Sequence, residues 1–295
     1  MKDFIYLICA FVVIGCGKVD KSSLLPVDFR QFRGTQAEKL AEAVENEDTA
    51  EIIHQIRDLK IDVNSKTEGK ELTLLMLSVY HDKLNSTRCL LELGADPNIY
   101  TNRTKHEGET AVYIACEYER IRPQTLDLLM RYGGDPNSMQ TGVRRNNAGN
   151  YVTADNFALA KAASNSLEKV KILVNNGADV NKTHPGTNTS ALVTAMIKDE
   201  MAIAEYLLVK GADYTQKFHF GGYIGNDIHL DTDILYLLRL QSFELDSEKY
   251  ASKMRIVKFL RNKGLDYWKT PIPDRMVREI KRLYPNEWED YLKVY

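Results

Sequence analysis

Gly94-Ala95-Asp96-Pro97-Asn98 is the string that decides the fold, because variants of it return along the chain. The other copies are Ile61-Asp62-Val63-Asn64, Gly133-Gly134-Asp135-Pro136-Asn137, Gly177-Ala178-Asp179-Val180-Asn181, Gly211-Ala212-Asp213-Tyr214 and Gly264-Leu265-Asp266-Tyr267. Successive aspartates are 34, 39, 44, 34 and 53 residues apart, so two intervals share one length and the others contain insertions. Self-similarity at a period of this size indicates an array of stacked structural units.

Each of the five strings that begin with glycine follows a segment with helical periodicity. Apolar side chains recur at helical spacing in residues 86–91 and at the matching places 125–129, 170–174, 204–208 and 256–260. The glycine that follows fits a helix C-terminus, where a left-handed residue is needed. A second helix is predicted about twenty residues upstream, beginning after Thr73, Thr110 and Ser190, whose hydroxyl groups can cap it. One unit is therefore two helices and a turn.

This unit resembles the ankyrin repeat, which has two antiparallel helices and a turn in about 33 residues. The GADPN and GADVN strings are its most specific part, and the resemblance covers residues 36 to 268, although no copy keeps the proline or histidine of the usual Thr-Pro-Leu-His start. The resemblance implies an all-α fold, an ankyrin-repeat solenoid of about six helix pairs with projecting turns. We place the repeats at residues 35–268.

Both ends of the array are expected to be caps, because the outer face of a terminal repeat meets water. Thr35 to Glu51 holds six acids and one lysine, which is typical of an N-terminal capping repeat. Residues 269–295 predict a C-terminal helical cap, with a helix over Asp274 to Leu283 and then an aromatic tail with Trp288 and Tyr291. We interpret this tail as packing onto the last repeat rather than as a ligand site.

The composition indicates a folded chain. Its 295 residues include 39 Lys+Arg and 41 Asp+Glu, and 44% of them are hydrophobic. This chain is too apolar to be disordered and has too little positive charge for a general nucleic-acid binder. It contains no nucleophile elbow, no phosphate-binding loop and no His-Glu-x-x-His pair, and its six histidines are scattered. We therefore expect no enzyme activity, no cofactor, no metal site and no nucleic-acid partner.

The first residues have the features of an export signal. Phe4 to Cys16 are thirteen uncharged, mostly apolar residues, too few to span a membrane but typical of a signal-peptide core. Val13-Ile14-Gly15-Cys16 resembles the lipobox of bacterial lipoproteins, in which the cysteine receives acyl chains such as palmitate and becomes the first residue. The resemblance implies a signal peptide over residues 1–15 and an anchor on Cys16. Resemblance to enterobacterial lipoproteins implies that Gly17, in place of aspartate, directs the chain to the outer membrane, facing the periplasm. The alternative is an ordinary secretory signal with an accidental cysteine.

Residues 16–34 lack a clear period and are predicted to be a tether. Two cysteines, Cys89 and Cys116, remain once Cys9 leaves with the signal and Cys16 carries lipid. Both fall on apolar helix positions, which favours two buried free thiols. A disulfide between them stays open as an alternative, because the periplasm is oxidising.

The insertions lie at residues 99–109, 138–155, 182–189 and 214–229, with another between two helices at 241–250. Turns that project from one edge of a repeat array are where binding is expected. Aromatic and arginine side chains are typical of binding hot spots. We predict that a partner protein contacts Tyr100, Arg103, Arg144, Arg145, Tyr151, Phe218, His219, Phe220 and Tyr223. The alternative is that the rings fold back onto the repeats as a small core of their own.

Residues 253–282 hold ten Lys+Arg and three Asp+Glu. This stretch predicts a surface for an acidic partner or for anionic lipid headgroups. The alternative is a set of solvated helix faces with no binding role.

Lipidated ankyrin proteins of bacteria resemble immunity proteins that neutralise antibacterial effectors, notably phospholipases delivered by type VI secretion. This resemblance implies a periplasmic inhibitor, held at the membrane by Cys16, whose concave face and turns cover the active site of one toxic lipase. We expect a monomer. A function of a different class is an envelope scaffold or stress-protection factor that binds periplasmic enzymes. One tight partner indicates the first function, and several weak partners indicate the second.

Overall fold

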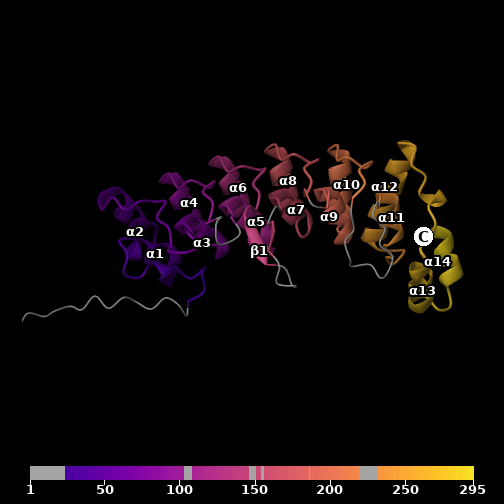
Figure 1. Cartoon of the computed structure of the whole chain (residues 1–295), viewed down its shortest axis with the longest axis horizontal. Coiled ribbons are helices and arrows are strands. Elements are labelled where there is room, and N and C mark those ends of the chain that lie inside the picture. The colour runs from indigo at the N-terminus through magenta and orange to yellow at the C-terminus, as the bar shows by residue number, and fades with distance from the viewer. Residues whose placement is uncertain (1–23, 103–107, 146–150, 154–155, 186, 219–231) are drawn as a thin grey trace, which may run out of the picture.

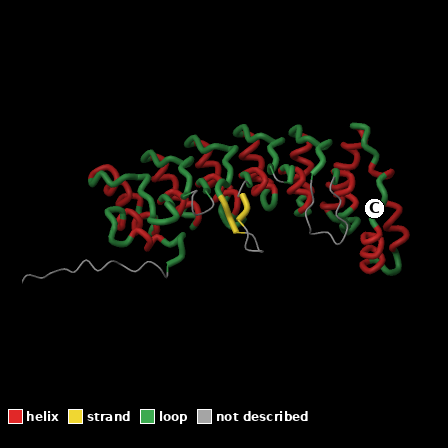
Figure 2. Tube along the Cα trace, in the orientation of Figure 1, coloured by secondary structure: helices red, strands yellow, loops and turns green. Residues whose placement is uncertain are grey.

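The computed structural model describes residues 24–102, 108–145, 151–153, 156–185, 187–218 and 232–295. Figure 1 shows helix pairs side by side, in chain order, along one elongated row. Figure 2 shows that turns connect these helices from one unit to the next. Each helix pair contacts the pair before it and the pair after it. The predicted all-helical solenoid is confirmed.

Six helix pairs and a two-helix cap make up the described row. The pairs are α1 (Glu38–Glu45) and α2 (Thr49–Ile53), α3 (Leu74–Tyr80) and α4 (Leu84–Glu92), α5 (Ala111–Glu117) and α6 (Pro123–Arg131), α7 (Ala158–Ala163) and α8 (Leu167–Asn175), α9 (Ala191–Ile197) and α10 (Met201–Val209), and α11 (Ile234–Arg239) and α12 (Glu248–Asn262). The cap consists of α13 (Asp274–Leu283), which has the predicted bounds, and α14 (Trp288–Val294). Short turns of other helix types are η1 (Phe29–Phe32), η2 (His54–Asp58) and η3 (Tyr267–Lys269).

The ends of the helices follow the predicted signals. Thr73, Thr110 and Ser190 each accept a hydrogen bond from the backbone N–H three residues later, at 3.2, 3.2 and 3.3 Å. From the second unit to the sixth, the second helix ends shortly before a glycine with positive φ, which is 92° at Gly94 and 88° at Gly264. The hydroxyl groups satisfy N–H groups that have no partner within the helix, and glycine adopts the left-handed conformation without the penalty of a Cβ atom.

The core runs along the whole row between the paired helices. All six side chains from Leu74 to Val79 are buried, as are all six from Ala111 to Cys116. Full burial of one large apolar side chain contributes about 1.5–3 kcal/mol, so these helices are held mainly by packing. Cys89 and Cys116 are buried free thiols, as predicted, and burial raises the pKa of Cys116 to about 12.

Asparagine side chains join the turns of neighbouring units. The Oδ1 atoms of Asn64, Asn98, Asn137 and Asn181 accept hydrogen bonds of 2.8–3.0 Å from the backbone N–H of the aspartate in the next string. The Nδ2 atoms of the last three also donate to a glycine carbonyl of the next unit, at 2.9–3.4 Å. We call these contacts the asparagine ladder. The recurring Asp-x-Asn string therefore sets the spacing between neighbouring turns.

A short antiparallel hairpin departs from the predicted all-helical pattern. It pairs β1 (Val143–Arg145) with β2 (Tyr151–Thr153), and Arg145 lies opposite Tyr151. Figure 1 shows β1 at the lower edge of the row, below α5. Each strand has three residues, too few to establish a period of two in the sequence. The insertion that contains the hairpin is nevertheless one of those predicted to project.

Part of the predicted tether is packed against the repeats. Phe29 and Phe32 of η1 are 4% and 1% exposed, and η1 lies against α1. His81 holds the same segment from the next unit, because its Nε2 donates to the Val27 carbonyl oxygen (2.7 Å) and its ring lies 5.2 Å from that of Phe29. The tether prediction is therefore wrong for residues 24–34, where two aromatic anchors replace a periodic pattern. The signal segment, Cys16 and the rest of the tether lie outside the described residues.

The helices α13 and α14 close the last unit, as predicted for a cap. Tyr291 and Tyr295 are 3% and 0% exposed. The Tyr291 hydroxyl donates to the Phe243 carbonyl oxygen (2.6 Å), and the Tyr250 hydroxyl donates to that of Val294 (2.8 Å). The aromatic tail thus packs onto the preceding unit, which confirms its interpretation. In the part of the chain that the structure describes, no helix has the length and apolar character needed to cross a membrane.

Candidate binding surface

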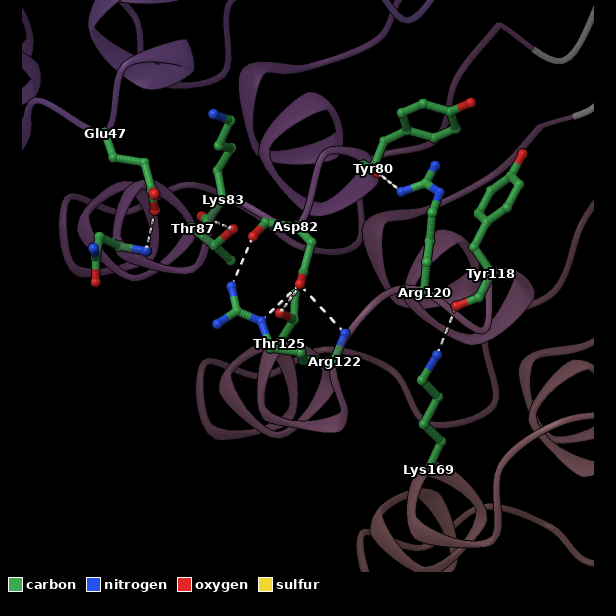
Figure 3. A network of polar contacts seen from close by, with 11 residues as sticks. Glu47, Tyr80, Asp82, Lys83, Thr87, Tyr118, Arg120, Arg122, Thr125 and Lys169 are labelled. Carbon is green, nitrogen blue, oxygen red and sulfur yellow. Dashed lines mark hydrogen bonds and ion pairs between the residues drawn. The ribbon is translucent and has the colours of Figure 1, made fainter.

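The C-terminal ends of α3 and α5 present two tyrosines with an arginine between them, as Figure 3 shows. The guanidinium carbon of Arg120 lies 4.4 Å from the ring centre of Tyr80 and 4.9 Å from that of Tyr118. The two rings meet edge to face at 5.2 Å, and Arg120 also donates to the Tyr80 carbonyl oxygen. Both rings are half-buried and Arg120 is exposed. We call these three residues the tyrosine–arginine patch.

Polar contacts hold the turns on which the patch stands (Figure 3). Asp82, in the turn after α3, accepts hydrogen bonds from Arg122 Nε (2.6 Å) and from the Thr125 hydroxyl (2.9 Å) of the next unit. Arg122 also donates to the Asp82 carbonyl oxygen (2.9 Å). In the unit before, Glu47 accepts from the backbone N–H of Asn85 (2.9 Å). A single exposed ion pair contributes about 0–1 kcal/mol, but several bonds on one carboxylate fix the two turns relative to each other.

A buried cation supports Tyr118 from within the row. Lys169 of α8 is 1% exposed, and its Nζ donates to the Tyr118 carbonyl oxygen (2.7 Å). Burial lowers the pKa of Lys169, and burial also raises the pKa of Tyr118 to about 12. The Tyr118 hydroxyl therefore keeps its proton at neutral pH and can donate a hydrogen bond to a partner. Lys169 positions this residue without reaching the surface itself.

A polar groove of about 190 Å³ lies between α7 and α9. Its polar lining consists of Asn156, Lys161, Ser164, His184, Thr189, Thr194 and Lys198. Lys161 forms an ion pair with Glu117 (2.9 Å), which connects the groove to the end of α5 that bears Tyr118. Lys198 is exposed and forms no ion pair with any residue that the structure describes. The groove therefore presents an ammonium group that is suited to pair with a carboxylate.

Eight of the nine residues predicted to contact a partner fall into three groups. Tyr100 is half-buried in the turn after α4. The backbones of Arg144, Arg145 and Tyr151 form the hairpin of β1 and β2. Arg103, His219, Phe220 and Tyr223 lie outside the described residues, as does Cys16.

Phe218 requires a correction. Its side chain is 0% exposed and belongs to the main core. Its backbone forms two hydrogen bonds of 3.1 Å with Thr232, which draw the two ends of the insertion together. The prediction that Phe218 contacts a partner is therefore wrong, and the alternative of an aromatic ring folded onto the repeats is correct for this residue.

The basic stretch at residues 253–282 is partly buried and partly paired. Lys253 is 0% exposed. Arg255 bonds to Glu205 (2.7 Å) and to Glu248 (2.6 Å). Two further cations pair with acids of their own segments, Lys269 with Asp266 and Arg282 with Glu279. These contacts favour the interpretation of solvated helix faces over that of a basic binding surface.

The predicted contacts did not include the tyrosine–arginine patch. Tyr80 is the last residue of α3 and Tyr118 is the first residue after α5, so both lie near the end of the first helix in consecutive units. An aromatic residue near the end of the first helix in two neighbouring repeats is the signal that could have found them. Neither residue lies in an insertion, so a search for long turns passes over both.

Comparison with known proteins agrees with this architecture. Residues 40–140 match the family model for ankyrin repeats in three copies. No curated protein is similar to the chain in sequence. Among the residues described, no group of three or more His, Cys, Asp or Glu is placed to hold a metal ion. Beyond the matched residues, α7 to α12 continue the same pattern of paired helices. The chain therefore folds as an ankyrin-repeat solenoid, a module for protein–protein interaction.

Proposed function

We propose that this chain is a lipid-anchored protein of the bacterial envelope that faces the periplasm and neutralises an antibacterial effector, such as a type VI secreted phospholipase. The ankyrin repeats support binding to another protein. Val13-Ile14-Gly15-Cys16 supports a lipid anchor, because it resembles a lipobox behind an apolar segment. A lipid on Cys16 would hold the inhibitor at the membrane that a phospholipase attacks.

The tyrosine–arginine patch is the observation that best supports a protein partner. Tyrosine and arginine are enriched among the residues that dominate binding energy. Arg120 already contacts both Tyr80 and Tyr118, so these side chains lose little conformational freedom when a partner binds. The exposed guanidinium group can donate hydrogen bonds to a carboxylate or carbonyl of the effector while the rings pack against its apolar atoms.

The groove between α7 and α9 supports a second contact with the same partner. Lys198 can bind a carboxylate there. The Lys161–Glu117 ion pair lies between this groove and the patch. We therefore expect the effector to present an acidic loop along α5, α7 and α9, and charge complementarity of this kind mainly raises the rate of association.

Affinity capture tests the identity of the partner. Residues 17–295 are immobilised and exposed to envelope and secreted extracts of the same strain, and mass spectrometry identifies what binds. The proposal predicts one stoichiometric partner with lipase or other toxin activity, and that activity falls on binding. Several weak partners would instead support an envelope scaffold or stress-protection factor and contradict the inhibitor proposal.

Arg120→Ala and Tyr118→Ala test the patch itself. Each substitution should weaken binding of the captured effector by about ten- to a hundredfold, because truncation of a hot-spot residue costs about 2 kcal/mol or more. Arg131→Ala is the matched control, since Arg131 is exposed on α6 and pairs with Asp127 of the same helix. It should leave the dissociation constant within about twofold. Equal losses in all three variants would exclude the patch as the contact.

Cys16→Ala tests the lipid anchor separately. In bacterial cells the full chain should fractionate with membranes, and the variant should be found in the soluble envelope fraction. Cys89→Ala is the control, because this thiol is buried in the repeats and has no access to a lipid donor. Membrane fractionation of Cys16→Ala that matches the unmodified chain would contradict the lipoprotein proposal without affecting the binding proposal.

A further inference from the structure

The C-terminal cap bounds a groove that the proposed effector contacts do not use. It lies between the turn from α11 to α12 and the two cap helices, and its volume is about 780 Å³. Leu245 lines it from the turn, Tyr284 from the end of α13, and Val294 from α14. A groove of this size holds several side chains rather than one.

The floor of the groove is apolar and rigid. Tyr284 stacks on Tyr291, with ring centres 4.5 Å apart and planes 16° apart. The Tyr291 hydroxyl is fixed by two hydrogen bonds with the backbone of Phe243, at 2.6 and 3.0 Å. Above this floor Leu245 and Val294 are 46% and 40% exposed. Apolar side chains on a rigid base are suited to bind an apolar side chain of a partner.

The rim of the groove is acidic. It consists of Glu244, Asp246, Glu287 and Asp290, all of them exposed. Asp290 pairs with Lys293 (2.6 Å), but the other three form no ion pair within the residues described. Three uncompensated carboxylates therefore surround the apolar floor. They repel acidic ligands and attract cationic ones.

We propose that this groove binds a basic, apolar segment of a partner protein. One or two large apolar side chains of that segment pack on Tyr284, Leu245 and Val294, and the flanking lysines or arginines pair with Glu244 and Glu287. The surface is separate from the patch and from the α7–α9 groove, so the segment can come from a protein other than the effector. Its recognition requires both the carboxylates and the apolar floor.

The test uses residues 17–295 and a fluorescent peptide of alternating lysine and leucine, with binding followed by anisotropy. Saturable binding is expected. The combined substitutions Glu244→Lys, Asp246→Lys and Glu287→Lys should lower the affinity by about tenfold or more. The matched control combines Glu42→Lys, Glu68→Lys and Glu92→Lys, three exposed acids of other units with the same total change of charge. The affinity of this control protein for the peptide should stay within about twofold of that of the unmodified protein.

Leu245→Ser and two control peptides separate the apolar contribution from the electrostatic one. The substitution should lower the affinity for the lysine–leucine peptide severalfold. The unmodified protein should bind a lysine–serine or a glutamate–leucine peptide much more weakly than the lysine–leucine peptide. Equal losses in the two charge-reversed proteins would mean that the peptide responds to net charge alone. Equal binding of either control peptide, or no saturable binding of lysine–leucine, would overturn the proposal.

Discussion

The two ends of the row are held together in different ways. From α1 to α10 the asparagine ladder repeats the same backbone contacts from turn to turn. At the last step Thr215 stands where the earlier strings have asparagine, and its hydroxyl and backbone N–H both donate to Asp213 of the same turn. No contact of the ladder kind then leads to Asp266 among the described residues. The join from α9 and α10 to α11 and α12 is made by other contacts, such as the hydrogen bond from Gln241 Nε2 to the Met196 carbonyl oxygen and the ion pair of Arg255 with Glu205.

The cap is joined to the last unit by two buried basic side chains among aromatic rings. Arg239 is 3% exposed and donates to the carbonyl oxygens of Thr270 (3.1 Å), Tyr267 (3.0 Å) and Tyr295. Lys253 is 0% exposed, donates to a backbone carbonyl (2.8 Å) and lies 4.0 Å from the ring centre of Tyr295. A short recurring string is sufficient between units that share the same architecture. The cap packs against the last unit alone, and a cluster of side chains specific to that contact holds it there.

The largest expected effect comes from Arg239→Met. This change removes three hydrogen bonds to buried carbonyl groups and the contact with the Tyr267 ring, which lies 3.8 Å from the guanidinium carbon. Since each buried group left unsatisfied costs about 1–3 kcal/mol, we expect the free energy of unfolding to fall by about 3–5 kcal/mol. Hydrogen exchange should show the loss in α11 to α14, while α3 to α8 keep their protection.

Arg255→Met is the matched control for that experiment. Arg255 lies in α12 near the cluster, but it is 47% exposed and bonds to Glu205 and Glu248 at the surface. Its loss should cost less than about 1 kcal/mol. Similar costs for the two arginines would contradict the view that the buried cluster holds the cap.

Lys253→Met should change how stability depends on pH. Burial, followed by the charge of Arg239, lowers the pKa of Lys253 to about 7. An unfolded lysine titrates near 10.4, so between these values the unfolded chain binds more protons and the native protein gains stability as pH rises. From pH 7 to 9 the gain should approach about 2 kcal/mol, and the methionine variant should lack it.

Denaturant unfolding of both proteins at pH 7, 8 and 9 measures this effect. The difference between the two proteins matters, because cysteines and tyrosines shared by both also titrate above pH 8 and their contributions cancel. Parallel pH profiles would show that Lys253 titrates as it does in the unfolded chain.

The helix pairs and the turns that follow them could be predicted from the sequence because each depends on local signals. Gly94 follows a periodic helix and needs a positive φ, and Thr73 stands one residue before an apolar run. The cluster of Arg239 and Lys253 could not be predicted, since its members lie on different helices and their partners are backbone carbonyl groups. In the sequence Lys253 is one of ten basic residues in the stretch 253–282, and Arg239 lies outside that stretch.

The candidate surface shows the same limit. The sequence predicts contacts in long turns, where Phe218 belongs to the core instead. Arg120 acquires its role only because α3 and α5 pack side by side and bring two tyrosines within reach of it. The burial of Phe218 and the exposure of Arg120 both depend on tertiary packing, which a single sequence does not reveal.

A smaller loss of stability is expected when one asparagine of the ladder is replaced. Asn137→Ala removes the hydrogen bond from the Asp179 N–H (2.8 Å) and the bond to the Gly177 carbonyl oxygen (3.3 Å). Two neutral hydrogen bonds near the surface should lower the free energy of unfolding by about 1.5 kcal/mol. Thr215→Ala, which loses a side-chain bond within one turn, should cost about 0.5 kcal/mol. Equal costs would show that the ladder contributes no stability between units.

The smallest effect concerns a feature that both regions share. Gly94 and Gly264 have φ of 92° and 88°, and a Cβ atom added at either meets nothing within 4 Å. Substitution by alanine therefore brings only the conformational penalty, about 1 kcal/mol in each case. Chemical denaturation of Gly94→Ala and Gly264→Ala should give equal losses, because the helix ends are built alike although the joins between units differ. A much larger loss at Gly264 would mean that this turn also positions the buried cluster, and the two regions would then differ in their helix ends as well.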